Sequence, residues 1–377
     1  MTAQLQRNGI QVVHGRAAFV SDHVIEVQYV NGQSEQFEAQ DFVIATGSKP
    51  RLIDHMAVDH EHIYDSDSIL SLGYLPRSMM VFGGGVIACE YASIFALLGV
   101  DVTLVDRYPQ PLGFLDQDLV AHFVGAFEAM GGRFLGETEV TDVRFDGVSA
   151  VVATLADGQE LLADKALCAL GRVSQVGRLT IDKAGLSVNE RELIDVDADG
   201  RTSVRHIFAA GDVVGPPSLA SASMEQGRRA ACALLDMPSG EQGEFLPSGI
   251  YSVPELASVG LTEAQTRERF GDALVGRAHY REIARGLIAD STDGMLKLVA
   301  APDGTLTGMH IVGAQATDLI HIGQMALIHA DNASVFVENI FNFPTYSESY
   351  RVAALDLLAR SRLAADGDPS QDGRTAA

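Results

Sequence analysis

The chain has 377 residues and a formal net charge of −23, because 50 acidic side chains outnumber 27 basic ones. That charge argues against a nucleic acid or an anionic membrane as partner, since binding to phosphates needs a basic face. A hydrophobic content of 47% is ordinary for a globular protein, and the length predicts two or three domains.

The cysteines and the apolar runs predict a cytoplasmic protein. Cys89, Cys168 and Cys232 lie far apart in apolar surroundings, and the sequence contains no Cys-x-x-Cys pair. We interpret them as buried free thiols in a reducing compartment. The first twenty residues lack the apolar core of a secretory signal, and the longest apolar runs, such as 92–100, are too short to span a bilayer.

The first 47 residues are predicted to form β-structure. Apolar residues indicate strands over 9–15, 18–20 and 24–30, and Asn31-Gly32 is a hairpin signal before a return strand at Phe37. A buried strand over 42–47 then ends in a turn.

A glycine-rich turn follows between two predicted elements. An apolar lead-in at 81–82 runs into Gly-x-Gly-x-x-Ala, and a helical pattern continues to residue 99. Gly83 permits the tight turn, Gly85 lets the backbone approach a pyrophosphate, and Ala88 lets the helix pack close to the strand. The helix N-terminus offers unpaired N–H groups to phosphates. This order predicts a dinucleotide-binding unit, and the alternative is a glycine turn before a buried helix.

An acidic residue and a basic residue end the next predicted strand, over 102–105. Asp106 lies 23 residues after Gly83, where an acid that binds ribose hydroxyls belongs. It suits NAD(H) and would repel the 2′-phosphate of NADP(H), whereas Arg107 could pair with that phosphate. The pair is therefore predicted to accept both nucleotides; the alternative is that Arg107 is a solvated surface residue.

Short strands recur further along the chain. They are predicted over 148–152, 154–155 and 161–162, with a hairpin signal at Asp157-Gly158. Two buried strands end on glycine, over 165–170 before Gly171 and over 207–210 before Gly211-Asp212. An alanine-rich helix is predicted over 218–235.

The last third mixes strands, over 296–299 and 309–312, with amphipathic helices over 316–329 and 347–363. Prolines and glycines over 246–260 indicate a domain boundary. His321 and His329 share a helix face, but helix packing is favoured over a metal and no metal site is predicted. The polar stretch 364–377 is predicted to be disordered.

Five separated motifs together resemble the pyridine nucleotide-disulfide oxidoreductase family of flavoenzymes. They are 44–50 (Ile-Ala-Thr-Gly-Ser-Lys-Pro), the glycine turn at Gly83, 169–172 (Ala-Leu-Gly-Arg), 207–212 (Ile-Phe-Ala-Ala-Gly-Asp) and 251–263. The resemblance implies an α/β protein with Rossmann-like FAD- and NAD(P)-binding domains, the FAD domain incomplete, and an α+β C-terminal dimerisation domain. The implied limits are 1–55 and 173–245 for the FAD domain, 56–172 for the NAD(P) domain, 246–363 for the dimerisation domain and 364–377 for the tail.

The resemblance also implies the cofactors FAD, NAD(H) and NADP(H) and a set of binding residues. Thr46 and Gly47 would pack against FAD, and Asp212, next to Gly211, would accept a hydrogen bond from the ribityl chain. A helix N-cap or turn aspartate is the alternative for Asp212. The helix after Ser218 would direct its positive end at the flavin; it begins near Leu219 and Ala220. Glu90 would lie near the nicotinamide, and Gly171 would approach the nucleotide from the other side.

Two departures from the family bear on the activity. The family's first Gly-x-Gly-x-x-Gly unit, which holds the ADP half of FAD, and the redox-active cysteine pair that follows it are not in this sequence. Residue 1 is therefore expected to fall inside the FAD domain, through truncation, a start-site error or natural variation. Phe343 stands where disulfide reductases of the family carry a histidine base.

Disulfide reduction needs a thiolate pair and a base, whereas hydride transfer between nucleotides needs neither. The sequence therefore favours the transhydrogenase branch of the family, NADPH to NAD⁺ and the reverse, with cofactors rather than catalytic side chains carrying the hydride. The alternatives are a disulfide reductase like dihydrolipoamide dehydrogenase and a non-catalytic nucleotide-binding remnant. The family also implies a homodimer or higher homo-oligomer. The apolar helix residues could serve that interface or the core: Leu319, Ile322, Met325, Ile328, Val352, Leu355 and Leu358.

Overall fold

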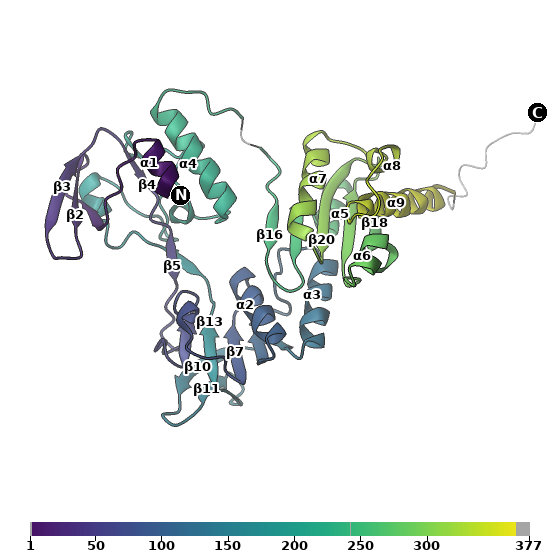
Figure 1. The fold of residues 1–377 in the computed structure, drawn as a ribbon, viewed down its shortest axis with the longest axis horizontal. Coiled ribbons are helices and arrows are strands. Elements are labelled where there is room, and N and C mark those ends of the chain that lie inside the picture. Colours follow the sequence, from purple (N-terminus) through teal and green to yellow (C-terminus); the bar gives the residue numbers. More distant parts are fainter. Residues whose placement is uncertain (1, 242, 367–377) are drawn as a thin grey trace, which may run out of the picture. The chain divides into compact units, whose positions relative to one another are not determined.

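The computed structural model describes residues 2–241 and 243–366, and the chain forms two compact units whose elements are labelled in Figure 1. Unit 1 consists of the described parts of Met1–Arg51 and Arg172–Glu241, and unit 2 of those of Leu52–Gly171 and Gln242–Ala377. Both mix helices with strands, so the predicted α/β class is confirmed. The finer domain limits given above stay a prediction.

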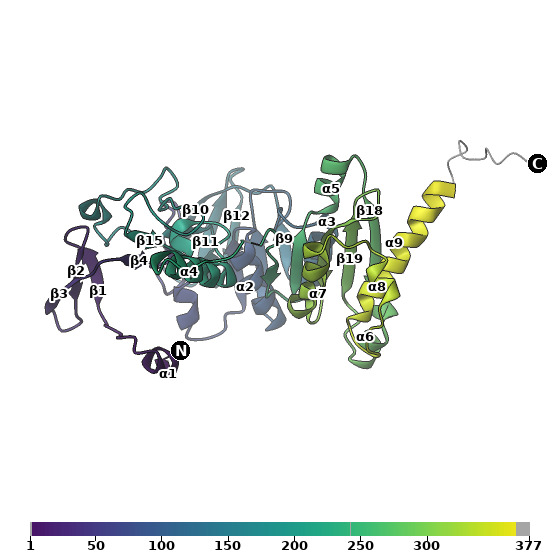
Figure 2. The same ribbon diagram turned by 90° about the horizontal axis from the view of Figure 1, so that it is seen from above.

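Unit 1 is built from short strands that pair across its two chain segments. A three-stranded antiparallel sheet, β1-β2-β3, comes from the first segment; β4 pairs in parallel with β15, and β5 pairs antiparallel with β14. Figure 2 shows β4 beside β15. The element bounds are α1 Thr2–Arg7, β1 Arg16–Phe19, β2 Val24–Gln28, β3 Ser34–Glu38, β4 Phe42–Ile44, β5 Ser48–Pro50, β14 Arg172–Ser174, β15 Ile207–Ala209 and α4 Ala220–Leu234, with 3₁₀ turns at Ile181–Ala184 and Asp212–Val214.

The strand predicted over 9–15 is wrong. These residues have no strand assignment, and the apolar side chains of Ile10 and Val12 are exposed. A strand exists only where its backbone groups pair with a neighbour, so an apolar run by itself does not make one.

The first part of unit 2 centres on a five-stranded parallel sheet with the order β6-β13-β7-β8-β9. Parallel strands covered on both faces are apolar throughout, and β13 is buried along its whole length. Helix α2 packs on the sheet through Ala88, Ala92 and Ala96, spaced four residues apart. The bounds are β6 Ile63–Asp65, β7 Ser78–Phe82, α2 Val86–Leu97, β8 Asp101–Val105, α3 Gln117–Ala129, β9 Arg133–Leu135 and β13 Lys165–Cys168, with a 3₁₀ turn at Ser68–Ser71.

Along the chain, a separate three-stranded antiparallel sheet is inserted between β9 and β13 of the parallel sheet. Its strands are β10 Val140–Phe145, β11 Val151–Leu155 and β12 Glu160–Ala163. The predicted hairpin signal at Asp157-Gly158 joins the last two strands, where Gly158 adopts a φ of +84°.

The rest of unit 2 is a five-stranded antiparallel sheet with the order β16-β17-β20-β19-β18. Helices α7 and α9 pack on it, as Figure 2 shows, and Tyr350 of α9 donates a hydrogen bond from its hydroxyl to the Leu319 carbonyl of α7 at 2.8 Å. The bounds are β16 Ser248–Ile250, β17 Leu256–Gly260, α5 Glu263–Phe270, β18 Leu274–His279, α6 Ala284–Ile288, β19 Met295–Ala300, β20 Leu306–Val312, α7 Ala316–Ile328, α8 Val335–Glu338 and α9 Glu348–Asp366, with a 3₁₀ turn at Tyr280–Glu282.

The side-chain alternation of this sheet divides its residues between two cores. Leu296 and Ile311 join the core with α7 and α9, whereas Met295 and Val312 join the core that contains α3. Of the apolar helix residues left open between core and interface, Leu319 is core, Ile322, Val352 and Leu358 are partly buried, and Met325, Ile328 and Leu355 are exposed.

A row of polar residues crosses the face of the sheet that is turned toward α3. Ser258, His310, Lys297 and Arg277 are direct partners on neighbouring strands β17, β20, β19 and β18. The His310 ring is buried between Ser258 Oγ, 2.7 Å from Nδ1, and the Leu261 carbonyl, 3.0 Å from Nε2. A buried polar row is stable only where partners satisfy it.

Three carboxylates around the Lys297 ammonium supply those partners. Its Nζ lies 2.7 Å from Asp116 Oδ1, 2.9 Å from Asp118 Oδ2 and 2.8 Å from Glu263 Oε2. Arg277 adds a contact of 2.7 Å to Asp118. Asp116 is also the N-cap of α3 and accepts the Glu263 N–H. The network therefore ties α3 and α5 to the sheet.

This network predicts a loss of stability in acid. Burial by itself raises the carboxyl pKa values, but the hydrogen bonds and charges of Lys297, with Arg277 at Asp118 and Arg267 at Glu263, together outweigh it and hold the pKa of Asp118 and of Glu263 below their ordinary values. A lowered pKa contributes stability above the unfolded-state value that is lost as the pH falls through the folded-state value. Burial also lowers the pKa of His310. The unfolded chain therefore binds a proton at this residue more readily than the folded one, and folding stability is lost as the pH falls below about 6.5. We expect the free energy of unfolding to decline below pH 6.5 and more steeply below about pH 4.5, as measured by urea unfolding across pH. A free energy that stays flat down to pH 3.5 would contradict this.

The C-terminal end and the helices complete the description. Residues 364–366, predicted to belong to a disordered tail, are part of α9, and 367–377 lie outside the described residues. No helix within residues 2–241 and 243–366 has the length and apolarity needed to cross a membrane.

Candidate functional site

The glycine turn between β7 and α2 has the geometry that its sequence predicts. Gly83 has a φ of +116°, and a Cβ there would lie 2.7 Å from the Ala169 carbonyl oxygen. Only glycine fits such a position. Ala88, in the first turn of α2, is fully buried against the sheet.

Gly85 leaves the N-terminus of α2 open. It is the N-cap of the helix, no side chain caps the first turn, and no atom lies within 4 Å of the place where its Cβ would be. The first N–H groups of a helix have no intrahelical partner and carry a partial positive charge. The open cradle therefore fits the pyrophosphate of a dinucleotide.

Asp106 follows β8 and lies against the same turn. A Cβ on Gly84 would overlap the Asp106 carboxylate, and the Gly84 carbonyl accepts the Leu112 N–H at 2.7 Å. Burial raises the pKa of Asp106, although hydrogen bonds from the backbone N–H groups of Tyr108 and Arg107 oppose that rise. Gly84, the middle glycine of the run, to which the sequence analysis gave no role, is therefore what admits the acid.

Arg107 is exposed, and its side chain packs against Tyr108. Its guanidinium lies 4.8 Å from the centre of the Tyr108 ring and donates a hydrogen bond of 2.9 Å to the Tyr108 hydroxyl. This arrangement holds the cation one residue beyond Asp106, and its role toward a 2′-phosphate stays a prediction.

Glu90, predicted to lie near the nicotinamide, has a structural partner. Its carboxylate accepts the Tyr251 N–H at 2.8 Å, and Ser93, one turn further along α2, accepts the Val253 N–H at 3.0 Å. Helix α2 therefore holds the segment at 251–253. Gly171, which follows β13 and ends the first chain segment of unit 2, has a φ of +104°.

The residues predicted to contact flavin lie together in unit 1. Thr46 and Gly47 follow β4, and Gly211 and Asp212 follow β15, at the carboxyl ends of two adjacent parallel strands. Ligands of open α/β sheets bind at that edge. Gly47 and Gly211 have φ values of +69° and +83°, and Thr46 is exposed.

Asp212 belongs to a polar junction that sequence reasoning missed. Ser48 donates its hydroxyl to Asp212 Oδ2 at 2.7 Å and accepts Arg172 Nε–H at 2.8 Å, while Arg172 Nη2 donates to the Ser48 carbonyl at 2.9 Å. Three of the motifs meet here. No pattern in the sequence signals this meeting, because the partners lie 124 and 164 residues apart.

Helix α4 begins beside this junction. Leu219 is its N-cap and Ala220 its first residue, and no side chain caps the first turn. Gln226 of the same helix accepts the Gly211 N–H at 2.8 Å. An uncapped N-terminus next to Asp212 fits the electron-rich end of a flavin.

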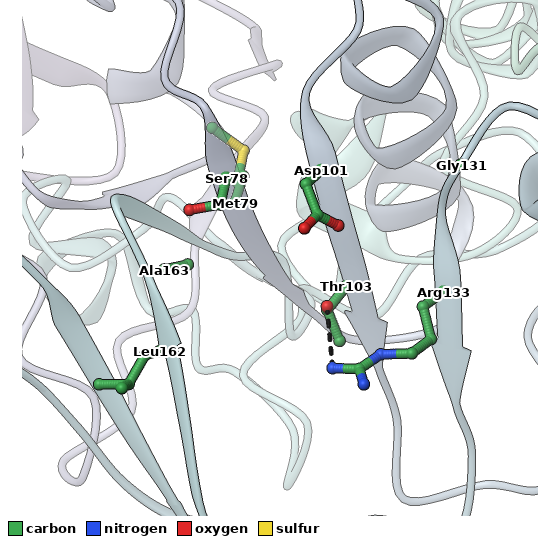
Figure 3. Close-up of a pocket in the computed structure, with 8 residues that line it drawn as sticks. All are labelled: Ser78, Met79, Asp101, Thr103, Gly131, Arg133, Leu162 and Ala163. Atoms are coloured by element: carbon green, nitrogen blue, oxygen red, sulfur yellow. Dashed lines mark hydrogen bonds between the residues drawn. The ribbon is translucent and has the colours of Figure 1, made fainter.

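A pocket of about 340 Å³ lies elsewhere in unit 2. Figure 3 shows its lining, in which the Arg133 side chain bonds to Thr103. It lies at the starts of β7, β8 and β9, the end of the sheet opposite to Gly83 and Asp106. It contains none of the predicted residues, and the strand ends that bind ligands in such sheets are the other ones.

Phe343 is exposed, 73% of its surface being accessible, and precedes Pro344. A phenyl ring cannot transfer a proton. Each of the three cysteines is a free thiol in the described structure, and burial strongly raises the pKa of Cys89. Neither feature suits disulfide reduction.

Comparisons with known proteins identify the family of the chain. Residues 1–227 match the family described as Pyridine nucleotide-disulphide oxidoreductase, and residues 246–354 match its dimerisation domain. The soluble pyridine nucleotide transhydrogenase of Azotobacter vinelandii is 40% identical over 364 residues, covering 95% of this chain and 78% of the relative. That of Mycobacterium tuberculosis is 40% identical over 361 residues, covering 95% and 77%.

Solved structures give the same fold. LpdA from Mycobacterium tuberculosis superposes with a TM-score of 0.86 at 26% identity, over 94% of this chain and 79% of that one. The HOCl-induced flavoprotein disulfide reductase RclA from Escherichia coli gives a TM-score of 0.85 at 26% identity, over 92% and 79%.

Proposed function

Because this chain belongs to the pyridine nucleotide-disulphide oxidoreductase family, we propose that it is an FAD-dependent transhydrogenase that moves hydride between NADPH and NAD⁺ in either direction. The observation that carries the proposal is its similarity, along nearly the whole chain, to proteins named soluble pyridine nucleotide transhydrogenase. FAD, when bound, supplies a two-electron carrier between the two nicotinamides.

The residues of unit 2 bind and orient the nicotinamide nucleotide in this proposal. The open helix end at Gly85 receives the pyrophosphate, and Asp106 accepts hydrogen bonds from the adenosine ribose of NAD(H). Arg107 pairs with the 2′-phosphate of NADP(H). Glu90 accepts the Tyr251 N–H and thereby fixes the start of the segment at 251–253. Each of these roles is a proposal from local geometry.

The residues of unit 1 orient the flavin. Asp212 accepts a hydrogen bond from the ribityl chain, and the N-terminus of α4, at Leu219 and Ala220, stabilises negative charge on the reduced ring. Ser48 donates a hydrogen bond to the Asp212 carboxylate, and Arg172 in turn holds Ser48 in place. No side chain needs to donate or take a proton, so Phe343 at the position of the base is consistent with this reaction.

The test is hydride transfer by the full chain after incubation with FAD. NADPH and a thionicotinamide analogue of NAD⁺ are mixed with it, and reduction of the analogue is followed by its absorbance. A chain that retains flavin but reduces only a disulfide such as lipoamide would overturn the proposal in favour of a disulfide reductase. A chain that stays colourless would point to the nucleotide-binding remnant.

Replacing Arg107 with alanine is expected to separate the two nucleotides. The dissociation constant for NADPH should rise about three- to tenfold, the range of one exposed ion pair with a phosphate, and that for NADH should change little. Fluorescence titration of the reduced nucleotides measures both constants without FAD. Arg133→Ala, at the opposite end of the sheet, is the control. Equal losses for NADPH and NADH would contradict the assignment.

Assembly and location follow the family. The dimerisation domain over 246–354 supports a homo-oligomer, with the exposed Met325, Ile328 and Leu355 available to an interface. We propose a cytoplasmic enzyme whose partners are nicotinamide nucleotides and further copies of itself. The net charge of −23 disfavours nucleic acid or an anionic membrane.

A further inference from the structure

Two histidines and an aspartate gather on the surface of unit 1, outside the motifs assigned to nucleotides. Asp22 and His23 lie in the turn between β1 and β2, and His206 directly precedes β15. One ligand atom from each of the three residues lies within 4.8 Å of the other two.

Hydrogen bonds to backbone carbonyls fix the tautomers of both rings. His23 Nδ1 lies 2.9 Å from the Ala39 carbonyl, and His206 Nε2 lies 2.9 Å from the Asp22 carbonyl. A carbonyl oxygen only accepts, so these nitrogens carry the hydrogens. The neutral rings therefore present His23 Nε2 and His206 Nδ1 as bare lone pairs. Histidines that ligate metals commonly have their second nitrogen bonded to a carbonyl or carboxylate, as both of these do.

The backbone positions of the two histidines are held as well. The Ala39 N–H donates to the His23 carbonyl at 3.1 Å, and the Phe42 N–H donates to the His206 carbonyl at 2.9 Å. The rings stack with centres 4.0 Å apart and planes 9° apart. Lone pairs in parallel planes do not converge, so a metal about 2.0–2.1 Å from both nitrogens requires one ring to tilt. His23 is exposed and borders an open depression of about 480 Å³ lined also by Glu38 and Gln40.

We propose that Asp22, His23 and His206 bind a divalent transition-metal ion of the zinc class. Two imidazoles and one carboxylate suit Zn²⁺, Ni²⁺ or Cu²⁺, whereas Mg²⁺ and Ca²⁺ prefer oxygen ligands alone. Water completes the coordination because the cluster is open to solvent.

The position of the cluster gives the ion a structural consequence. Its ligands come from both chain segments of unit 1, since Asp22 and His206 are 184 residues apart. A metal held by both segments closes that long loop and stabilises the folded unit. The ion would act as a clip beside the β4–β15 pair, and this role is independent of the proposed hydride transfer.

The test uses the full chain, freed of metal by dialysis against a chelator, and Zn²⁺ alone as the probe. Calorimetric titration should give a site whose affinity falls at least about tenfold in His23→Ala and in His206→Ala, and less in Asp22→Asn. His329→Ala, an exposed histidine after α7, is the matched control and should leave the affinity unchanged. Zinc should raise the melting temperature of the wild-type chain and not that of the His23→Ala/His206→Ala double variant.

Cobalt(II) gives a second readout that does not depend on stability. The wild-type chain should show visible d–d absorption from a nitrogen-bound ion, and the double variant should lose that absorption. Equal zinc affinity in the double variant and the wild-type chain, or no site at 100-micromolar zinc, roughly the weakest affinity consistent with a clip, overturns the proposal.

Discussion

Replacing Lys297 with methionine is expected to lower the free energy of unfolding by about 3–5 kcal/mol, the cost of removing one partner from a buried ion pair. The Lys297 and Asp116 side chains are each only 2% exposed. Methionine has a similar length but no charge, so the variant leaves Asp116 buried without its cation, whereas Asp118 and Glu263 keep their contacts with Arg277. Urea unfolding followed by circular dichroism measures the loss.

Two further variants separate the charge effect from a general loss of packing. Arg267→Met removes a cation from the same network, but its side chain is 48% exposed, so it should cost less than about 1 kcal/mol. Combining Lys297→Met with Asp116→Asn removes the orphaned charge and keeps an N-cap residue for α3, so it should recover part of the loss. If Lys297→Met is no worse than Arg267→Met, the network does not hold α3 to the sheet.

Replacing Gly85 with alanine is expected to weaken nucleotide binding about tenfold or more, equivalent to about 1.4 kcal/mol, with little change in folding. Its φ of −81° is open to alanine, and its Cβ would meet no atom of the protein. A poorer N-cap and a less flexible unfolded chain oppose each other, so stability should stay within about 1 kcal/mol. The new methyl group instead occupies the space into which the pyrophosphate must come.

The measurement pairs a dissociation constant with a melting temperature. Titration with NADH gives the first and a thermal melt the second. Gly125→Ala, on the exposed side of α3, is the matched control: it also adds a methyl group in open space, and it should bind NADH normally while stabilising its helix. Unchanged NADH binding by Gly85→Ala would place the pyrophosphate elsewhere.

Local patterns located several helices and the glycine turn of the nucleotide site. The predicted helix over 316–329 is α7, Ala316–Ile328, and that over 218–235 is α4, Ala220–Leu234. The turn at Gly83 could be predicted because a tight strand-to-helix turn requires glycine at fixed offsets, whatever surrounds it. The absence of a strand over 9–15 could not be predicted, since a strand forms only where a neighbouring strand pairs with it, whatever its own residues are.

In the flavin region, the contacts between side chains could not be predicted from the sequence. The family resemblance pointed to Asp212, but it did not point to Ser48, which donates a hydrogen bond to the Asp212 carboxylate, or to Arg172, which holds Ser48. Both lie in motifs that were noticed for other reasons. Strand alternation states which face a side chain occupies, and it does not state what lies opposite.

By itself, the sequence determined the α/β class, the glycine turn with the acid that follows the next strand, and the family to which these belong, because each depends on residues close together in the chain. Only the tertiary structure decided that Lys297 meets Asp116 across 181 residues, that Gly84 makes room for Asp106, and that His23 stacks on His206. Those contacts depend on which elements pack together, and packing is decided by the whole fold rather than by any local run of residues.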